Sequence, residues 1–446
     1  MQLPRAPLTW HVFRIAARVA LTFDSYDWRA ERDRRIVERV LAAIPFGFVV
    51  ALIVFASGAV VSFLFIDMHN PAADIAAARY AWAPVYLIAL LMMVMRPLRT
   101  LQHVGATPLI VLCVLLAGAS HLWSVDPALS LRRAIALMMS TCLGYALAAW
   151  LDWRKLTQAV SVAFLFLGIL TIAIVLADPW RGQMQEVYPG AWRGPWVQKN
   201  DLGGMMAKGL IATLGAWALV PKRAWLWGPT ALVCIFLVLM STSKTALLVS
   251  LAAIGLFAWM AMYRALFPLR PLLAGALIGG ALLLWGALSL FPAETLALIG
   301  KDPTFTGRTD IWRELGIAIR ESWLLGYGYG AFWMDPLGPS YRIQSVLEWG
   351  VPSAHNGWVE IWLAAGVGLV ALFALHLLVT LVAALRALHS QTREAYFALL
   401  FLLAYIAFSL SESAILQQND LTWVLFVAIS AKLMVGDSSG RRATDR

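Results

Sequence analysis

The stretch "VPSAHNGWVEIWLAAGVGLVALF", residues 351–373, joins an apolar run to a polar entrance. From Trp358 to Phe373 every residue except Glu360 is apolar or glycine, and the run predicts a membrane helix over residues 357–383. His355, Asn356 and Glu360 stand where this helix would leave water. Ionisable residues at that depth are costly to bury, so their presence suggests a functional site.

The whole chain has the composition of a polytopic membrane protein. Of its 446 residues, 61% are hydrophobic and 13% are charged. The apolar runs predict an all-α fold with about twelve transmembrane helices. Their predicted ranges are 41–66, 80–95, 104–120, 131–150, 156–176, 202–220, 225–241, 244–262, 271–291, 357–383, 396–411 and 421–435. The net charge of +10 does not indicate nucleic-acid binding, because no basic run alternates with aromatic residues in a soluble segment.

The distribution of Lys and Arg predicts the orientation of the chain. Residues 1–40 carry eight arginines and form a predicted cytoplasmic segment, in which "LTWHVFRIAARVAL" has the pattern of an interfacial helix. With both termini cytoplasmic, the inner side holds 22 of the 35 Lys and Arg residues. Outside residues 1–40 the two sides are nearly even, so the orientation depends on that segment.

The organisation that follows has five parts. Residues 1–40 precede transmembrane helices 1–9 in residues 41–291, which include an outer loop at 178–201. A large outer loop covers residues 292–356. Transmembrane helices 10–12 occupy residues 357–435, and residues 436–446 form a cytoplasmic tail. Cys113, Cys142 and Cys234 fall inside apolar runs, which predicts that they are packing residues.

Cations on the outer side are exceptions to the positive-inside rule. The outer group comprises Arg132, Arg133, Arg181, Arg193, Lys199, Lys244, Arg308 and Arg313. Any one of them is explained by snorkelling to the interface. Together they indicate an anionic ligand such as phosphate or pyrophosphate, which guanidinium groups bind bidentately.

Arg308 is the most informative of these cations. Ile311, Leu315 and Ile319 lie at helical spacing and predict a helix over 309–323 whose apolar face rests on the membrane surface. Arg308 then stands at the helix N-terminus, where the dipole disfavours a cation unless an anion is bound. The competing interpretation is a local ion pair with Asp310 or Glu314, and the two interpretations have about equal weight.

One arginine and two lysines of the outer group lie close to the N-termini of further predicted helices. Arg193 and Lys199 flank the turn "GPW", and "KND" opens a membrane helix with Asn200 or Asp201 as its cap. Lys244 lies in the short turn "MSTSKTALL", where an ammonium needs a partner or a water-filled cavity. A capping or interfacial role explains Lys199 more readily than Arg193.

His355 faces the same outer compartment as these cations. An imidazole can accept a proton from a hydroxyl group at neutral pH, which makes His355 a candidate base. Considered alone, a histidine at a helix start is more often a cap or an interfacial residue. Glu348 and Glu360 are the carboxylates near it in the chain, and Glu360 suits either the helix dipole or a hydrogen bond.

Several motifs in order resemble one known family. "QKND", "STSKTALL", "TFTGRTDIWRELGIAIRESWLLGYGYGAFW" and "AHNGWVEIWLAAGVGL" together resemble the bacterial O-antigen ligase and O-antigen polymerase superfamily, the WaaL and Wzy group. "WSVDP" with "SLRRA" at 123–134 is also similar, and the match runs from about residue 110 to 370. "TFTGRTDIW" with "GYGYGAFW" looks most similar to the ExoQ-like exopolysaccharide polymerases.

The resemblance implies a metal-independent, inverting, GT-C-like membrane glycosyltransferase without a cofactor. It implies a donor glycan on undecaprenyl pyrophosphate at the periplasmic face of the bacterial inner membrane. His355 matches the proposed catalytic base and Arg308 the essential arginine of the large loop. Arg193 matches the arginine of the earlier loop, and Arg132 or Arg133 is a further phosphate contact. Lys199, Lys244 and Asn356 complete the candidate substrate-binding residues.

Alternatives differ in the acceptor or in the class of protein. A polymerase extends another lipid-linked glycan, whereas a ligase transfers the glycan to lipid A core. Other polysaccharide-assembly proteins would be possible partners, and a non-catalytic assembly subunit is a further alternative. A lipid-linked oligosaccharide transporter also suits twelve helices, but transporter sites lie near the bilayer midplane and these ionisable residues gather at one face.

Overall fold

The computed structural model describes residues 46–66, 76–186, 188–290, 308–333, 338–348, 350–390 and 392–436. Within these ranges every regular element is helical, apart from an isolated β-bridge between Gln183 and Trp192. The all-α prediction is therefore confirmed. The predicted interfacial helix before residue 41, the residues 291–307 and the tail beyond residue 436 lie outside the described residues.

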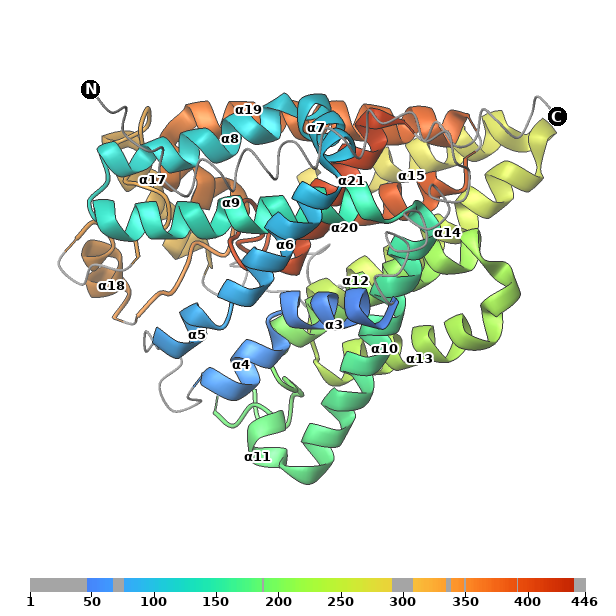
Figure 1. The fold of residues 1–446 in the computed structure, drawn as a ribbon, viewed down its shortest axis with the longest axis horizontal. Helices are drawn as coiled ribbons and strands as arrows, with labels where there is room; N and C mark the ends of the chain where they lie inside the picture. The colour runs from blue at the N-terminus through green and yellow to red at the C-terminus, as the bar shows by residue number, and fades with distance from the viewer. Residues whose placement is uncertain are drawn as a thin grey trace, which may run out of the picture.

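The longer helices lie side by side, with α17 and α18 at one end of the molecule and α14 and α15 at the other (Figure 1). The helices of the first half are α3 (Phe46–Ala56), α4 (Ala59–Phe65), α5 (Ala76–Tyr80), α6 (Ala83–Met95), α7 (Pro97–Ala106), α8 (Pro108–Ala119), α9 (Pro127–Trp150), α10 (Trp153–Ala177) and α11 (Pro179–Gly182). Those of the second half are α12 (Lys199–Leu219), α13 (Ala224–Met240), α14 (Lys244–Ala265), α15 (Arg270–Leu290), α17 (Arg308–Glu321), α18 (Tyr341–Leu347), α19 (Gly357–His389), α20 (Glu394–Ser409) and α21 (Leu421–Val435).

These helices are those of a multi-pass membrane protein. Seven helices in the described residues are long and apolar enough to cross a bilayer, and nine spans result if each of two bent pairs is one span. The bent pairs are α3 with α4, at 58°, and α7 with the helical residues 108–122, at 84°. Shorter apolar helices cover Phe267–Leu277, Glu394–Ser409 and Leu421–Val435. The polytopic class is confirmed, and the number twelve stays a prediction.

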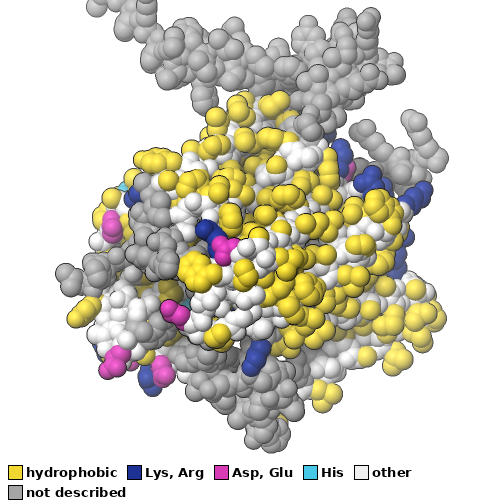
Figure 2. All heavy atoms as spheres, turned by 90° about the horizontal axis from the view of Figure 1, so that it is seen from below, with side chains coloured by type: hydrophobic (Ala, Val, Ile, Leu, Met, Phe, Trp, Pro, Cys, Tyr) yellow, Lys and Arg dark blue, Asp and Glu magenta, His cyan; other side chains and the backbone are white. Residues whose placement is uncertain are grey.

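The outer surface carries the apolar side chains that a lipid-facing protein needs. Figure 2 shows a face covered mostly by hydrophobic side chains. Most basic side chains visible on it gather at the right edge, and most acidic ones lie to the left. In Figure 1 the right end holds α14 and α15, and the left end holds α17 and α18. This separation follows the charge asymmetry that is typical of membrane proteins.

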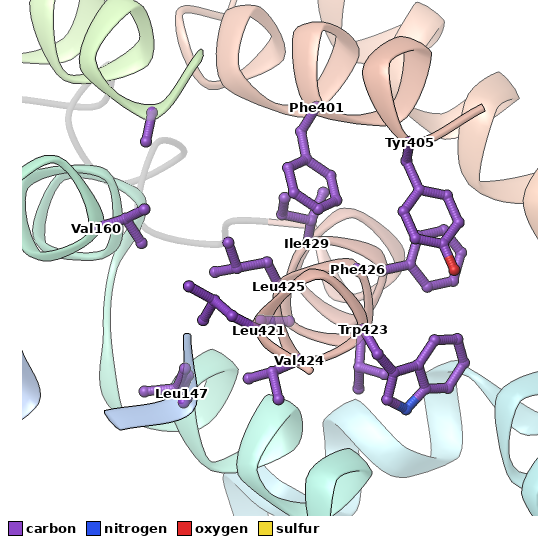
Figure 3. Packing of buried hydrophobic residues seen from close by; sticks show 14 of the residues in the cluster. Leu147, Val160, Phe401, Tyr405, Leu421, Trp423, Val424, Leu425, Phe426 and Ile429 are labelled. Atoms are coloured by element: carbon purple, nitrogen blue, oxygen red, sulfur yellow. The ribbon is translucent and has the colours of Figure 1, made fainter. Parts of the chain in front are cut away.

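Helix α21 is the centre of the hydrophobic core. Most of its residues are buried, because the helix is apolar all round and is surrounded by other helices. The rings of Tyr405 and Phe426 stack with centroids 4.5 Å apart, and Trp423 stacks on Phe426 at 5.5 Å (Figure 3). This core fixes the start of α21, and with it the loop that joins α20 to α21.

Helix α19 is broken at Ala365 and Gly366, about two turns after its start at Gly357. Gly366 has φ 71° and ψ −170°, so the helical hydrogen bonds stop there. The segment after α17 fills the break: the amide of Tyr327 donates to the carbonyl of Leu363 at 2.7 Å, and the amide of Val367 donates to the carbonyl of Trp323 at 3.0 Å. A broken helix at membrane depth needs such substitutes for its lost hydrogen bonds.

The predicted helix over 309–323 is present as α17. Its apolar face does not lie open to a membrane. Ile311, Leu315 and Ala318 are buried in a small second core that also contains Ile343 of α18 and Leu363 of α19. The indole of Trp312 donates to the carbonyl of Ala354 at 2.9 Å. The apolar face is therefore packed within the protein, next to the segment that leads to His355.

Substitution Gly366→Ala tests the break in α19. A Cβ at this position would lie 1.9 Å from the carbonyl oxygen of Leu324, and the positive φ strains any L residue. We expect a lower midpoint of thermal unfolding, with a loss of about 2 kcal/mol or more. The matched control is Gly368→Ala in the same helix, where the nearest atom is 3.8 Å away. An equal midpoint for both variants would contradict the role of the break.

Candidate active site

His355 is held in an unusual backbone conformation directly before α19. Its φ is 48°, a left-handed value that non-glycine residues rarely adopt and that is often associated with functional sites. The next residue, Asn356, caps the helix: its Oδ1 accepts hydrogen bonds from the amides of Trp358 at 3.0 Å and Val359 at 3.3 Å. The predicted substrate-binding residue Asn356 therefore serves here as the N-cap of α19.

A carboxylate joins His355 to Arg308. Glu412 Oε2 lies 3.7 Å from His355 Nδ1, and its Oε1 lies 3.4 Å from Arg308 Nη2. Arg308 Nη1 also donates to the carbonyl of Ser411. The two residues predicted to be catalytic are thus brought together, although neither predicted local partner of Arg308 is used. Asp310 pairs instead with Arg313, at 2.9 Å.

Glu360 is a positioning residue for this cluster. Its half-buried carboxylate accepts hydrogen bonds from the amide of Ala354 at 2.6 Å, from the indole of Trp333 at 3.1 Å and from the hydroxyl of Ser413 at 3.2 Å. Ala354 precedes His355, and Ser413 follows Glu412. One carboxylate therefore fixes both segments that carry the imidazole and its partner.

The loop between α20 and α21 is the element that completes the site. The hydroxyl of Tyr329 donates to the carbonyl of Leu416 and to Gln418 Oε1, the latter at 2.8 Å. Burial raises the pKa of Tyr329, so its hydroxyl stays a donor. The hydroxyl of Tyr86 donates to Asn419 Oδ1 at 2.6 Å. These bonds hold the loop, and with it Glu412, in one conformation.

His355 and Glu412 line a cavity of about 410 Å³. Its walls come from the break between α3 and α4, the first turns of α12 and α14, the segment before α19 and the loop between α20 and α21. The size lies in the range of small-molecule sites, about 300–1,000 Å³. The ionisable side chains lining it are Asp201, Lys208, His355, Glu412 and Asp420. The site is thus not the uniformly cationic pocket that the outer cations suggested.

Three of the predicted cations occupy the first position of a helix near this cavity. Lys199 begins α12, Lys244 begins α14 and Arg308 begins α17. Residues on both sides of Lys199 and of Lys244 line the cavity, and the two lysines are close enough to repel each other. Lys199 donates to Thr242 Oγ1 at 3.1 Å. Its backbone belongs to the first turn of α12, where the amide of Gln198 donates to Asp201 Oδ2 at 3.1 Å.

The other predicted cations do not line the cavity. Arg193 is buried in the loop before α12, where it donates to the carbonyls of Arg181 at 2.9 Å and Trp180 at 3.2 Å. Burial, and then the neighbouring Arg181, lower the pKa of Arg193. Arg133 donates to the carbonyl of Gly330 at 2.6 Å, and Arg132 is exposed on α9. These contacts hold loops in place.

Three ionisable residues of the cavity lining were not identified from the sequence, namely Lys208, Glu412 and Asp420. Glu412 lies in a short loop near the end of the chain, and no motif points to it. Lys208 lies inside the apolar helix α12 and lines the cavity, where its ammonium donates to Thr422 Oγ1 at 2.6 Å. An ionisable residue inside a membrane helix is a recognised signal of function, so Lys208 was detectable. Among the described residues, no group of three or more His, Cys, Asp or Glu side chains could hold a metal ion.

The fold and the site define a multi-pass membrane protein with a polar cavity and a histidine–carboxylate–arginine cluster. Residues 229–374 match the family described as O-Antigen ligase. The chain is 29% identical over 291 residues to the "Exopolysaccharide production protein ExoQ" of Rhizobium meliloti (strain 1021), a match that covers 61% of this chain and 64% of that relative. The chain thus spans less than two thirds of this relative. The resemblance to the O-antigen ligase and polymerase superfamily is confirmed.

Substitution Glu360→Ala tests the positioning role of this carboxylate. The amide of Ala354 loses its acceptor, so we expect faster hydrogen–deuterium exchange in peptides covering residues 351–356 and 411–415. The control is Glu348→Ala, which removes an exposed carboxylate at the end of α18. Unchanged exchange in Glu360→Ala, or equal changes in both variants, would contradict the assignment.

Proposed function

We propose that this chain is an inner-membrane glycosyltransferase that polymerises glycan carried on undecaprenyl pyrophosphate, with its active site on the periplasmic face and both termini in the cytoplasm. The observation that carries the proposal is the placement of Glu412 between Arg308 and His355 at the edge of a cavity. The match to the O-Antigen ligase family supports transfer of a lipid-linked glycan. The relative's printed name, "Exopolysaccharide production protein", favours polymerisation over ligation.

The proposed reaction is a single displacement. An acceptor hydroxyl oxygen attacks the anomeric carbon of the donor sugar and forms the new glycosidic bond. The bond between that carbon and the pyrophosphate oxygen breaks, and its electron pair leaves with the pyrophosphate. Attack from the face opposite the leaving group inverts the anomeric configuration. The driving force lies in the donor, so this chain's residues need only orient the reactants and move one proton.

His355 takes that proton in the proposed mechanism. Glu412 faces Nδ1, which leaves Nε2 to accept the proton of the acceptor hydroxyl. The carboxylate orients the ring and stabilises the imidazolium that forms, as a carboxylate beside a catalytic histidine does in hydrolases. The proton then leaves to solvent through the cavity.

The leaving pyrophosphate needs cations, and the three helix starts supply them. A cation at the first position of a helix is disfavoured by the helix dipole, and a bound anion removes the penalty while backbone amides hold it. We assign Arg308, Lys199 and Lys244 to this role. Arg132, which is exposed on α9, is assigned as a further phosphate contact, and the guanidinium groups of Arg133 and Arg193 donate to carbonyl groups of loops.

Substitution His355→Ala tests the proposed base in cells that lack the native protein. Loss of a general base slows a reaction by about 10²–10⁴-fold, so we expect lipid-linked repeat units to accumulate and long polysaccharide to disappear. The amount of protein in the membrane should not change. His389→Ala, at the far end of α19, is the matched control and should restore polymer. Normal polymer with His355→Ala would exclude His355 from the reaction.

The same cells separate a polymerase from a ligase. Deletion that removes long exopolysaccharide while lipopolysaccharide stays intact identifies a polymerase. Deletion that leaves lipid-linked polymer and bare lipid A core identifies a ligase. If neither glycan changes, the proposed function is wrong.

Substitution Arg308→Lys tests whether the geometry of the guanidinium matters. A lysine keeps the charge but cannot bind Ser411, Glu412 and an anion through one planar group. We expect the rate of glycan transfer in proteoliposomes to fall about a hundredfold. The control Arg313→Lys changes an exposed arginine of the same helix and should retain activity. Full activity of Arg308→Lys would reduce its role to simple charge attraction.

A further inference from the structure

The cavity next to His355 has an excess of negative charge. Three carboxylates line it, those of Asp201, Glu412 and Asp420, and Lys208 is the lysine in the lining. Glu412 is paired with Arg308, and Lys208 donates to the hydroxyl of Thr422 rather than to a carboxylate. Counted over the lining alone, three carboxylates face one lysine, which leaves two net negative charges with His355 neutral; Arg308, Lys199 and Lys244 do not belong to the lining. Such a cavity is poorly suited to the pyrophosphate of the donor.

We propose that this cavity is the acceptor subsite and that Asp201 and Asp420 make it select an uncharged sugar against a sugar acid. The inference rests on the proposed function and deepens it. The pyrophosphate is then bound by the cations at the helix starts, outside the lining, while His355 stands between the two regions. This separation places the proton acceptor on the acceptor side of the reaction.

The two carboxylates each have one oxygen to offer a ligand. Asp201 Oδ2 accepts from the amide of Gln198 at 3.1 Å. Asp420 Oδ1 accepts from the amides of Thr422 at 2.6 Å and Trp423 at 3.1 Å. Asp201 Oδ1 and Asp420 Oδ2 accept no hydrogen bond from the described part of the chain. A carboxylate oxygen accepts strongly from a hydroxyl group, which a sugar provides in abundance.

The rest of the lining also suits a polyhydroxylated ligand. Side-chain amides of Gln198, Asn200 and Gln417 supply both donors and acceptors, and Phe408 supplies an aromatic ring. Aromatic faces pack well against the apolar C–H face of a sugar. A lining of this kind can bind several hydroxyl groups at once, and its one lysine, Lys208, already donates to Thr422.

A sugar acid meets repulsion in the same place. Its carboxylate would face Asp201 and Asp420 in a cavity where water screens charges less than in bulk solvent. Specificity depends on the difference between the two free energies of binding, and a like charge raises the one for the sugar acid only. The predicted selectivity therefore comes from charge, and it does not depend on which uncharged sugar is the natural acceptor.

The test uses a matched pair of acceptors. The repeat unit that accumulates in cells lacking this protein is one acceptor, and the same material with its primary alcohols oxidised to carboxylates is the other. We expect wild-type protein in proteoliposomes to show a kcat/KM about tenfold or more lower for the oxidised acceptor. The double variant Asp201→Asn with Asp420→Asn should lose most of this discrimination. Asparagine keeps the capping hydrogen bonds, so the fold is preserved.

The outcomes separate the inference from the proposed function. Equal use of both acceptors by the wild type, or unchanged discrimination in the double variant, overturns the inference and leaves the function standing. Transfer to neither acceptor overturns the function, and the inference with it.

Asp310→Asn is the control, because it removes a carboxylate from α17 outside the cavity lining. If Asp310→Asn lowers the ratio of the two kcat/KM values as much as the double variant does, the selectivity comes from the overall charge of the protein. That result overturns the inference about the cavity. The single variants Asp201→Asn and Asp420→Asn, checked by size-exclusion chromatography, serve if the double variant misfolds.

Discussion

The half-buried carboxylate of Glu360 holds together three segments of the chain through hydrogen bonds. It accepts from Ala354 ahead of α19, from Trp333 in the aromatic loop after α17, and from Ser413 between α20 and α21. A carboxylate buried without such partners would be strongly unfavourable. The hydrogen bonds that satisfy it are therefore the ones that set the distance between His355 and Glu412. The glutamate at the entrance of a membrane helix is explained by this role in positioning.

Irregular backbone interrupts two of the apolar helical segments, and one of these breaks lies at the cavity. The break between α3 and α4 contributes Ser57 and Gly58 to the cavity, and the break in α19 receives the loop after α17. Broken helices are tolerated in a membrane only where protein or water satisfies the freed groups. Here the indole of Trp196 donates to the carbonyl of Ser57 at 3.0 Å, so one break is closed by a residue of the cavity wall. The break between α3 and α4 thus brings irregular backbone to the cavity wall, where a regular apolar helix would present only side chains.

Apolar runs and helical spacing predicted the all-α membrane fold, because long apolar helices depend mainly on local sequence. Sequence reasoning also proposed His355 and Arg308 as site residues, because both stand at predicted helix starts on the outer side. It did not identify Glu412, because an acidic residue in a short loop has no local signature and acquires its meaning from a contact 104 residues away in sequence. It also assigned Arg193 to a ligand, although its guanidinium binds carbonyl groups of its own loop. Sequence gives the charge of a residue, but the direction of its side chain is set by tertiary packing.

The convergence of helix starts explains why acids and bases meet here in a protein with few charges. Helices α12, α14, α19 and α21 all begin around the cavity. The partial positive charge at each start favours carboxylates, and Asp201 and Asp420 satisfy amides in the first turns of α12 and α21. Lys199 and Lys244 at the same starts oppose that field. Carboxylates that stabilise the empty fold and cations that an anion would stabilise thus occupy neighbouring positions. Under the proposed function, the carboxylates would bind hydroxyl groups of the acceptor and the neighbouring cations would bind the phosphate groups of the donor.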